Sequence, residues 1–259
     1  MLLTGRTPET VALRTPKGIV VEVEPIFCRL SGEGAECAIR KDGGDDVDVT
    51  TGLPVIASVA LRPELSGEVR IHGGEGVGRV TKPGLDQPVG EAAINHVPRA
   101  MIKEALEKEA ESAGYAGGFD VTISIEGGAE TAKRTFNPHM GVEGGLSVLG
   151  TSGIVEPMSE QALVDTIRVE LRQRRADGAD YILLTPGNYG ADYIRGSIGL
   201  DPKTAVLTSN FIGDALKMCR ELGFRGALLI GHIGKLVKLA GGMWTVSYTH
   251  LRAHETGRN

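Results

Sequence analysis

Apolar and polar residues alternate along the first half of the chain. Ile19, Val21 and Val23 share one side of an extended segment. The same two-residue period recurs in three later segments, at residues 55–59, 69–71 and 121–125. This period is typical of half-buried strands that pair in an antiparallel sheet. We therefore predict a largely antiparallel sheet in this half.

One helix interrupts these strands. Asn95 and Pro98 suit its first turn, and Gly114 suits its end. Five apolar residues form its buried stripe: Val97, Met101, Ile102, Ala105 and Leu106. We therefore predict an α+β domain over residues 1–140, with a hinge near 137–141.

Continuous apolar runs replace the alternation from about Gly144 onward. Four such runs occur, at residues 146–149, 181–184, 205–207 and 227–230. Amphipathic segments separate them, and Ser159 and Asn210 are suited to cap the helices that follow. Such alternation predicts a parallel sheet covered on both faces, in an α/β domain over residues 141–245.

Both ends of the chain differ from the rest. The segment 246–259 resembles the translation of a sequencing adaptor, and we expect a non-native read-through tail there. His250 and His254 fall inside it, so we do not interpret them as metal ligands. The first five residues read like the end of a helix capped by Gly5. We expect a fragment truncated at both ends.

The composition and net charge of the chain exclude several functional classes. The formal net charge of −5 is unlike that of a nucleic-acid binder, and no apolar run is long enough to span a bilayer. The three cysteines, Cys28, Cys37 and Cys219, support neither a disulfide framework nor a zinc site. We therefore expect a cytoplasmic protein with no metal site, no nucleic-acid partner and no membrane partner.

Small and polar residues follow each apolar run of the second half. Ligands bind beyond the carboxyl ends of strands in open parallel sheets, so these residues predict one pocket. The alternative is ordinary loop composition, since such loops favour Gly, Ser and Asn. The predicted pocket residues of the four strand ends are Gly150, Thr151, Ser152, Gly153, Gly187, Asn188, Tyr189, Ser209, Asn210, Gly231 and His232.

A glycine-rich loop at 72–84 is the densest motif of the first half. Gly74 and Gly76 allow close backbone approach, and Arg79 and Lys82 add positive charge. We interpret the loop as a clamp on an anionic ligand, or alternatively as a glycine-rich hairpin. The segment 231–236 lacks the glycine and hydroxyl that a phosphate loop requires. The segment 42–48 is interpreted as an acidic turn rather than a calcium loop.

Several of these segments together resemble one known family. They are KDGGDDVDVT at 41–50, HGGEGVGRVTKPG at 72–84, FNPH at 136–139, GTSGIVEPMS at 150–159, PGNYG at 186–190, SNFIGD at 209–214 and GHIGKLVKL at 231–239. Over residues 2–244 the chain is similar to the CbiD family of cobalt-precorrin-5B C1-methyltransferases. Family members begin with a segment rich in Thr, Gly and Cys and an alanine-rich helix, which this chain lacks, and they continue past Trp244.

The resemblance implies a fold and an activity. The fold would be an α+β domain like the second domain of ribosomal protein S5, then a Rossmann-like α/β domain, incomplete at its C-terminus. The activity would be S-adenosylmethionine-dependent methylation of C1 of cobalt-precorrin-5B, giving cobalt-precorrin-6A in anaerobic cobalamin biosynthesis. Cobalt would be carried by the tetrapyrrole substrate. Homo-oligomerisation stays open.

The implied chemistry assigns roles to residues. For the donor we expect contacts from Gly150, Thr151, Ser152, Gly153, Gly187, Asn188, Asn210 and Asp214. For the carboxylates of the macrocycle we expect Gly74, Gly76, Arg79, Lys82, Lys133, Arg134, Lys235 and Lys238. His232 or Glu156 would handle the ring proton. Two alternatives remain: another α/β enzyme that binds a nucleotide or phosphometabolite, and a non-catalytic tetrapyrrole carrier.

Overall fold

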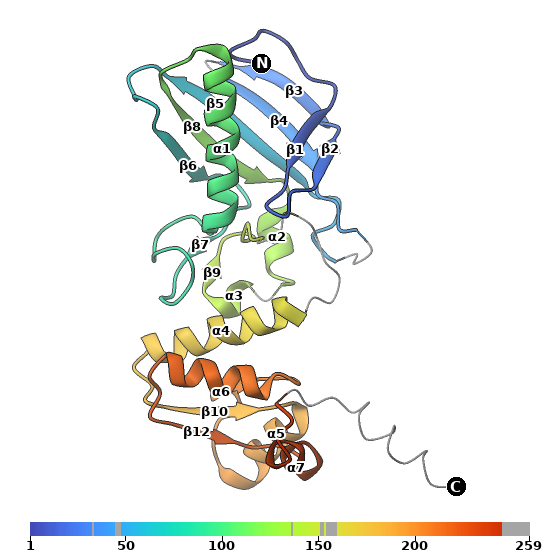
Figure 1. The fold of residues 1–259 in the computed structure, drawn as a ribbon, viewed down its shortest axis with the longest axis vertical. Coiled ribbons are helices and arrows are strands. Elements are labelled where there is room, and N and C mark those ends of the chain that lie inside the picture. Colours follow the sequence, from blue (N-terminus) through green and yellow to red (C-terminus); the bar gives the residue numbers. More distant parts are fainter. Residues whose placement is uncertain (33, 45–47, 136, 151–152, 154–159, 245–259) are drawn as a thin grey trace, which may run out of the picture. The chain divides into compact units, whose positions relative to one another are not determined.

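The computed structural model describes residues 1–259 except 33, 45–47, 136, 151–152, 154–159 and 245–259. The chain divides into two compact units, Met1–Met158 and Ser159–Asn259. Figure 1 labels most helices and strands of both units. The predicted tail and the predicted cap at Ser159 lie outside the described residues.

A five-stranded mixed sheet forms the framework of the first unit (Figure 1). Its strands, in spatial order, are β3 (Phe27–Ser31), β4 (Gly34–Arg40), β5 (Pro54–Arg62), β8 (Gly118–Ile125) and β6 (Val69–Gly73). Val121 of β8 pairs with Val59 of antiparallel β5 and with Ile71 of parallel β6. The prediction of antiparallel pairing is therefore wrong for β6, because the helix between β6 and β8 returns the chain in the same direction.

That helix, α1 (His96–Ala113), confirms the sequence prediction. Asn95 is its N-cap residue, and Gly114 closes it in the left-handed conformation with φ of 64°. Its apolar stripe, including Leu106 and Ala110, packs in one cluster with Val121 and other residues of the sheet. Burying each large aliphatic side chain contributes about 1.5–3 kcal/mol, so this stripe fixes the helix on one face of the sheet.

Shorter elements complete the first unit. They are β1 (Val11–Arg14), β2 (Val20–Val23), β7 (Arg79–Val80), β9 (Val142–Glu143), α2 (Gly128–Ala132) and α3 (Asn137–Met140). β1 and β2 form a hairpin, whereas β7 pairs in antiparallel fashion with the distant β9, in register Arg79 with Glu143. The predicted hinge at 137–141 contains α3 and lies within the first unit.

The apolar run 146–149 belongs to the first unit, not to the parallel sheet. Leu146 is 5% exposed in the core of this unit and makes an isolated bridge to Val77, while Val148 bridges Ile94. The prediction that this run is a strand of the second domain's parallel sheet is wrong, because periodicity within four residues does not identify the partner. The units consequently divide after Met158, whereas the sequence placed the boundary after residue 140.

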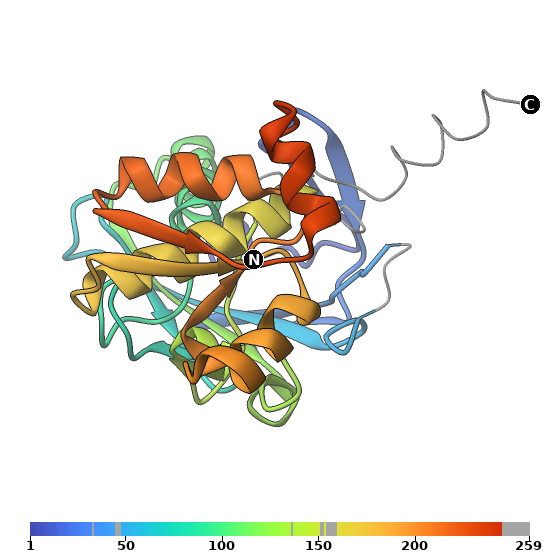
Figure 2. The ribbon, with the colours of Figure 1, turned by 90° about the horizontal axis from the view of Figure 1, so that it is seen from below.

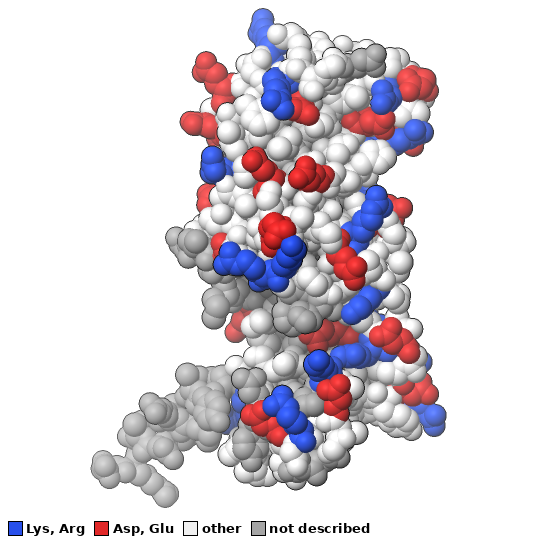
Figure 3. Space-filling view, turned by 180° about the vertical axis from the view of Figure 1, so that it is seen from behind, with Lys and Arg blue, Asp and Glu red and all other residues white. Residues whose placement is uncertain are grey.

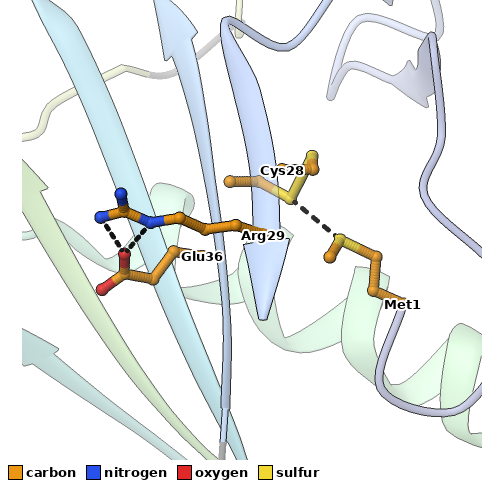
Figure 4. Close-up of a disulfide and its surroundings, with 5 residues drawn as sticks. Met1, Cys28, Arg29 and Glu36 are labelled. Atoms are coloured by element: carbon orange, nitrogen blue, oxygen red, sulfur yellow. Dashed lines mark hydrogen bonds and ion pairs between the residues drawn. A yellow bond between two sulfur atoms is a disulfide. The ribbon is translucent and has the colours of Figure 1, made fainter. Parts of the chain in front are cut away.

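Two of the three cysteines pair. Cys28 and Cys37 lie directly opposite each other on β3 and β4 and form a disulfide (Figure 4). Met1 Sδ lies 3.8 Å from Cys37 Sγ, and the neighbouring pair Arg29–Glu36 joins the same two strands at 2.7 Å. The expectation of no disulfide was wrong because the odd count of cysteines does not reveal a cross-strand neighbour.

The second unit contains a parallel sheet in the order β11-β10-β12 among its described residues. Its strands are β10 (Tyr181–Thr185), β11 (Ala205–Leu207) and β12 (Gly226–Leu229). Its helices are α4 (Glu160–Ala176), α5 (Asn188–Tyr193), a π-helix (Ile194–Ile198), a 3-10 helix (Pro202–Thr204), α6 (Ile212–Glu221) and α7 (Ile233–Ala240). Figure 2 shows this unit from below.

Alternate residues of β10 pack on opposite faces of this sheet. Ile182 and Leu184 lie in one core cluster with residues of α4 and α6, and Leu183 lies in another with Ile194. Cys219 of α6 sits in the first cluster, where burial raises the pKa of its thiol to about 11. The prediction of a parallel sheet covered on both faces is confirmed for this unit.

We predict that the Arg62–Asp120 pair makes the first unit sensitive to acid. Arg62 Nε donates to Asp120 Oδ2 at 2.6 Å, and this hydrogen bond holds the pKa of Asp120 below its ordinary value. The resulting stabilisation is complete above the unfolded-state pKa of about 3.9 and is lost as pH falls through the lower folded-state pKa.

Thermal unfolding of Asp120→Asn between pH 2 and 7 checks this prediction. The variant should be less stable than the parent at pH 7, and the difference should shrink below pH 4. Glu104→Gln, at an exposed position of α1, is the control. A difference that stays constant across the pH range would contradict the assignment.

Candidate functional site

The carboxyl edge of the parallel sheet brings three of the predicted strand ends together. β10, β11 and β12 run parallel, so residues 186–188, 208–210 and 230–232 follow them at the same edge. The fourth predicted strand end is elsewhere: Gly150 and Gly153 belong to the first unit. Thr151, Ser152 and Glu156 lie outside the described residues.

Lys235 connects two of these strand ends. Its Nζ donates to the carbonyl oxygen of Pro186 and to Oδ1 of Asn210, at 3.3 Å each. Burial lowers the pKa of Lys235, and the nearby charge of Lys238 lowers it further. Lys238, on the same helix, is only 8% exposed. The edge therefore carries positive charge next to carbonyl and amide oxygens.

Asn210 does not cap α6, contrary to the prediction. Phe211 is the N-cap residue of that helix, and the Asn210 side chain accepts from Lys235 instead. Ser209 has a φ of 49°, a left-handed conformation that costs a non-glycine residue about 1–2 kcal/mol. Such strain is found at sites where the surroundings fix a functional loop. Asp214 lies in the first turn of the same helix.

The remaining strand ends lead into helices. Gly187 and Asn188 follow β10, and Asn188 begins α5. His232 is the exposed N-cap residue of α7, and its Nδ1 accepts from the backbone N–H of Gly234 at 3.1 Å. An imidazole that uses Nδ1 as an acceptor carries its hydrogen on Nε2. The predicted role of His232 as a base therefore requires this cap to open.

The glycines of the 72–84 loop pack against the protein itself. A Cβ on Gly74 would overlap Ser124 Oγ, and a Cβ on Gly76 would overlap the carbonyl oxygen of Ile125. Gly76 also has a φ of 75°. Internal packing alone therefore accounts for glycine at both positions, and their predicted role in ligand binding stays a prediction.

Two of the predicted basic residues of the first unit, Arg79 and Lys133, have protein partners. Arg79 Nη1 donates to the carbonyl oxygen of Gly90 at 2.7 Å, and Lys133 Nζ lies 2.6 Å from Glu130 Oε1. The side chain of Lys82 covers Gly141, and Arg134 is exposed after α2. On the face drawn in Figure 3, basic side chains lie next to acidic ones.

The sequence did not predict a cavity of about 330 Å³ in the first unit. Five of its lining residues are apolar: Leu53, Val55, Ile125, Leu146 and Leu149. Six are polar: Lys41, Asp48, Thr50, Thr135, Asn137 and Ser147. The missed signal is Asp48 with threonines two and three residues later, a pattern typical of a side-chain-capped turn.

Two hydrogen-bond sets organise the polar wall of this cavity. Asp48 Oδ1 accepts from the backbone N–H and the hydroxyl of Thr50, at 2.8 and 2.6 Å, and lies 3.6 Å from Lys41 Nζ. On the other side, Ser147 Oγ donates to Asn137 Oδ1 at 3.2 Å. These bonds fix an anion and an amide on opposite loops of one cavity.

The described residues contain neither a metal-binding cluster nor a membrane-spanning helix. No group of three or more His, Cys, Asp or Glu side chains in these ranges could hold a metal ion. None of the helices in the described ranges combines the length and apolar character that a bilayer span requires.

A mixed-sheet unit followed by a parallel-sheet unit with polar strand ends is typical of α/β proteins that bind small ligands. The family model described as CbiD matches residues 1–157 of the chain. This match covers more than half of the 259 residues, so the chain belongs to the CbiD family.

Similar proteins carry one name. A protein of Ruminiclostridium cellulolyticum named cobalt-precorrin-5B C(1)-methyltransferase is 48% identical over 252 residues, covering 97% of this chain and 64% of that protein. Proteins of the same name from Thermoanaerobacter sp. and Tolumonas auensis are 45% and 42% identical, covering 97% and 96% of this chain and 67% and 64% of theirs. The chain thus spans 64% of the first relative's length.

A solved structure is also similar. It is the 1.9 Å crystal structure of the cobalamin biosynthesis protein CbiD from Archaeoglobus fulgidus, with 25% sequence identity and a TM-score of 0.47. The alignment covers 99% of this chain and 79% of that one.

We predict that Gly76→Ala destabilises the first unit by about 3 kcal/mol or more, because it adds a steric overlap to a left-handed φ. Gly90→Ala is the matched control: Gly90 has a φ of 93°, but nothing lies within 4 Å of its added Cβ. It should cost about 1–2 kcal/mol. Chemical denaturation of both variants measures the difference, and equal losses would show that packing at Gly76 is unimportant.

Proposed function

We propose that the protein to which this chain belongs methylates C1 of cobalt-precorrin-5B, using S-adenosylmethionine, to give cobalt-precorrin-6A during cobalamin synthesis. The observation that carries the proposal is the 48% identity, over 97% of this chain, to a protein named for that reaction. Because the chain spans 64% of that relative, the proposal concerns the whole protein. The cobalt belongs to the substrate.

The donor site we propose is the carboxyl edge of the second unit. S-adenosylmethionine supplies a methyl group on a sulfonium, together with an amino-acid carboxylate. Lys235 offers a cation for that carboxylate, and Asn210 offers an amide that Lys235 already orients. Gly187, Asn188 and Asp214 belong to the loop and helix starts at this edge. The chemistry of this residue set fits the donor.

Positioning is the contribution we assign to the protein. An electron-rich ring carbon needs little acid–base help to accept a methyl group, and alignment of the reacting atoms can lower the barrier by about 7–11 kcal/mol at best. The strained Ser209 and the ion–dipole contacts of Lys235 would keep the edge rigid enough for that task. His232, once released from its cap, and Glu156 remain our candidates for handling the ring proton.

The macrocycle would be held by cations, since its periphery carries several carboxylates. We propose Arg79, Lys82, Lys133 and Arg134 of the first unit and Lys235 and Lys238 of the second for this role. A locally basic surface binds a polyanion even when the net charge of the protein is −5. Gly74 and Gly76 stay in the proposal as backbone contacts of the macrocycle, and Gly150, Thr151, Ser152 and Gly153 stay in it as contacts of the donor.

The finer fold and the compartment are also proposals. The parallel crossover from β6 through α1 to β8 supports likeness to the second domain of ribosomal protein S5. A parallel sheet with helices on both faces supports a Rossmann-like second domain. A biosynthetic role supports a cytoplasmic location.

We predict that Asn210→Ala weakens binding of S-adenosylhomocysteine about tenfold, because it removes the oxygen that orients Lys235 and the amide beside it. Isothermal titration calorimetry on the full chain measures this. Asn95→Ala is the matched control, since the Asn95 side chain makes no cap hydrogen bond. An unchanged affinity in Asn210→Ala would show that the donor does not bind at this edge.

We predict that Arg79→Ala with Lys82→Ala, in a full-length relative, raises the KM for the tetrapyrrole about tenfold or more and leaves kcat nearly unchanged. Two cations at the periphery of the macrocycle would stabilise the bound substrate and the transition state equally. Removing them should therefore weaken substrate binding without slowing the reaction of the bound complex. A methyl-transfer assay measures both constants. An unchanged KM would reject the clamp, and tetrapyrrole binding without any transfer by the parent would favour a carrier.

A further inference from the structure

The cavity of the first unit has no part in the proposed methyl transfer. Its lining residues all belong to that unit and come from residues 41–55, from Ile125 and from residues 135–149. Val55 and Ile125, which pair across β5 and β8, lie at its apolar side. A cavity of about 330 Å³ is at the small end of the range for ligand sites, which is about 300–1,000 Å³.

Charge balance restricts the ligand. Lys41 Nζ lies 3.6 Å from Asp48 Oδ1, so the cation and the anion of the cavity neutralise each other. A macrocycle with several carboxylates would be larger than this cavity. The lysine of the cavity, Lys41, is already paired with Asp48 and would not be available to bind those carboxylates. The ligand that suits this wall is uncharged and has polar edges.

Asp48 specifies a hydrogen-bond donor on the ligand. Thr50 occupies Asp48 Oδ1 with its backbone N–H and its hydroxyl, which fixes the carboxylate and favours its ionised form. The structure gives Oδ2 no partner among the described residues. An ionised carboxylate accepts only, so it takes hydroxyl or N–H groups, as acidic side chains take the hydroxyls of a ribose.

Asn137 specifies the opposite chemistry. Its Oδ1 accepts from Ser147, which orients the amide so that the Nδ2 hydrogens are its remaining donors. These suit an unprotonated ring nitrogen or a carbonyl. Asparagine amides recognise base edges in this way. The aliphatic lining, including Leu53 and Leu146, suits the faces of a flat ring.

We propose that this cavity binds a purine nucleoside, with its ribose hydroxyls on Asp48 and an edge of its base on Asn137. The ring faces lie against the aliphatic side chains. The inference goes beyond the proposed function and does not depend on methyl transfer, because the donor edge of the second unit shares no residue with the cavity.

Calorimetric titration of the full chain with adenosine and 2′-deoxyadenosine tests the proposal. The parent should bind adenosine about tenfold or more tightly than 2′-deoxyadenosine, since the deoxy analogue loses a hydrogen bond to a charged group. In Asp48→Asn that preference should disappear, while adenosine affinity falls about tenfold. The asparagine keeps a side-chain oxygen for Thr50, so the loop should stay folded; circular dichroism checks this.

Two further variants make the test specific. Asp42→Asn is the matched control, because Asp42 is on the same loop, accepts from Gly44 and does not line the cavity. It should bind both nucleosides like the parent. Asn137→Ala should weaken both equally, because it acts on the base.

Three results would overturn the inference. They are the absence of saturable adenosine binding, a 2′-hydroxyl preference that survives in Asp48→Asn, and adenosine binding that is abolished by Asn210→Ala instead. The last result would assign the nucleoside to the second unit and support the proposed donor edge. Loss of S-adenosylhomocysteine binding in Asn210→Ala with unchanged adenosine binding would support both sites.

Discussion

Close backbone contact among three glycines fixes the 72–78 loop of the first unit against two later segments of the chain. The carbonyl oxygen of Gly76 occupies the space that a Cβ on Gly128 or Gly145 would need, and it accepts the N–H of Leu146 at 2.8 Å. Side chains at these positions would separate the 72–78 loop from the segment after β9. Leu146 and Ser147 would then leave the end of β8, and the cavity would lose one wall. Close backbone approach therefore creates the space that a ligand can use.

In the second unit, the proposed site depends on the central position of β10 in the sheet. Its hydrogen bonds continue one residue past the neighbouring strands, with Thr208 N–H donating to Thr185 and Ile230 N–H donating to Leu184. The three strand ends are thus held level, and Lys235 can reach from α7 across to Asn210. A single-residue slip in either neighbour would displace these groups by about 3.3 Å, which exceeds hydrogen-bond tolerance.

The sequence predicted the helices and strands well, because hydrophobic periodicity and helix capping depend on residues close together in the chain. Helix α1, with Asn95 before it and Gly114 after it, follows from its sequence alone. Partners could not be predicted in this way. The run at 146–149 reads as a parallel strand, yet Leu146 bridges Val77, and Cys28 meets Cys37 only because β3 and β4 form a hairpin. Three strand ends of the proposed donor edge were predicted from the sequence, whereas the cavity depends on loops that are distant in the chain.

The two sites differ in their electrostatics, and this difference decides which ligand suits each. At the proposed donor edge, Lys235 donates to neutral oxygens, and Lys238 adds a second positive charge on the same helix. Such a surface attracts an anionic group. In the cavity, Lys41 lies beside the ionised Asp48, so no net charge favours a carboxylate. Because desolvating an unpaired charge costs several kcal/mol, an anion should occupy the edge and a neutral molecule the cavity. The two proposed sites would therefore take ligands of different charge and would not compete for the same one.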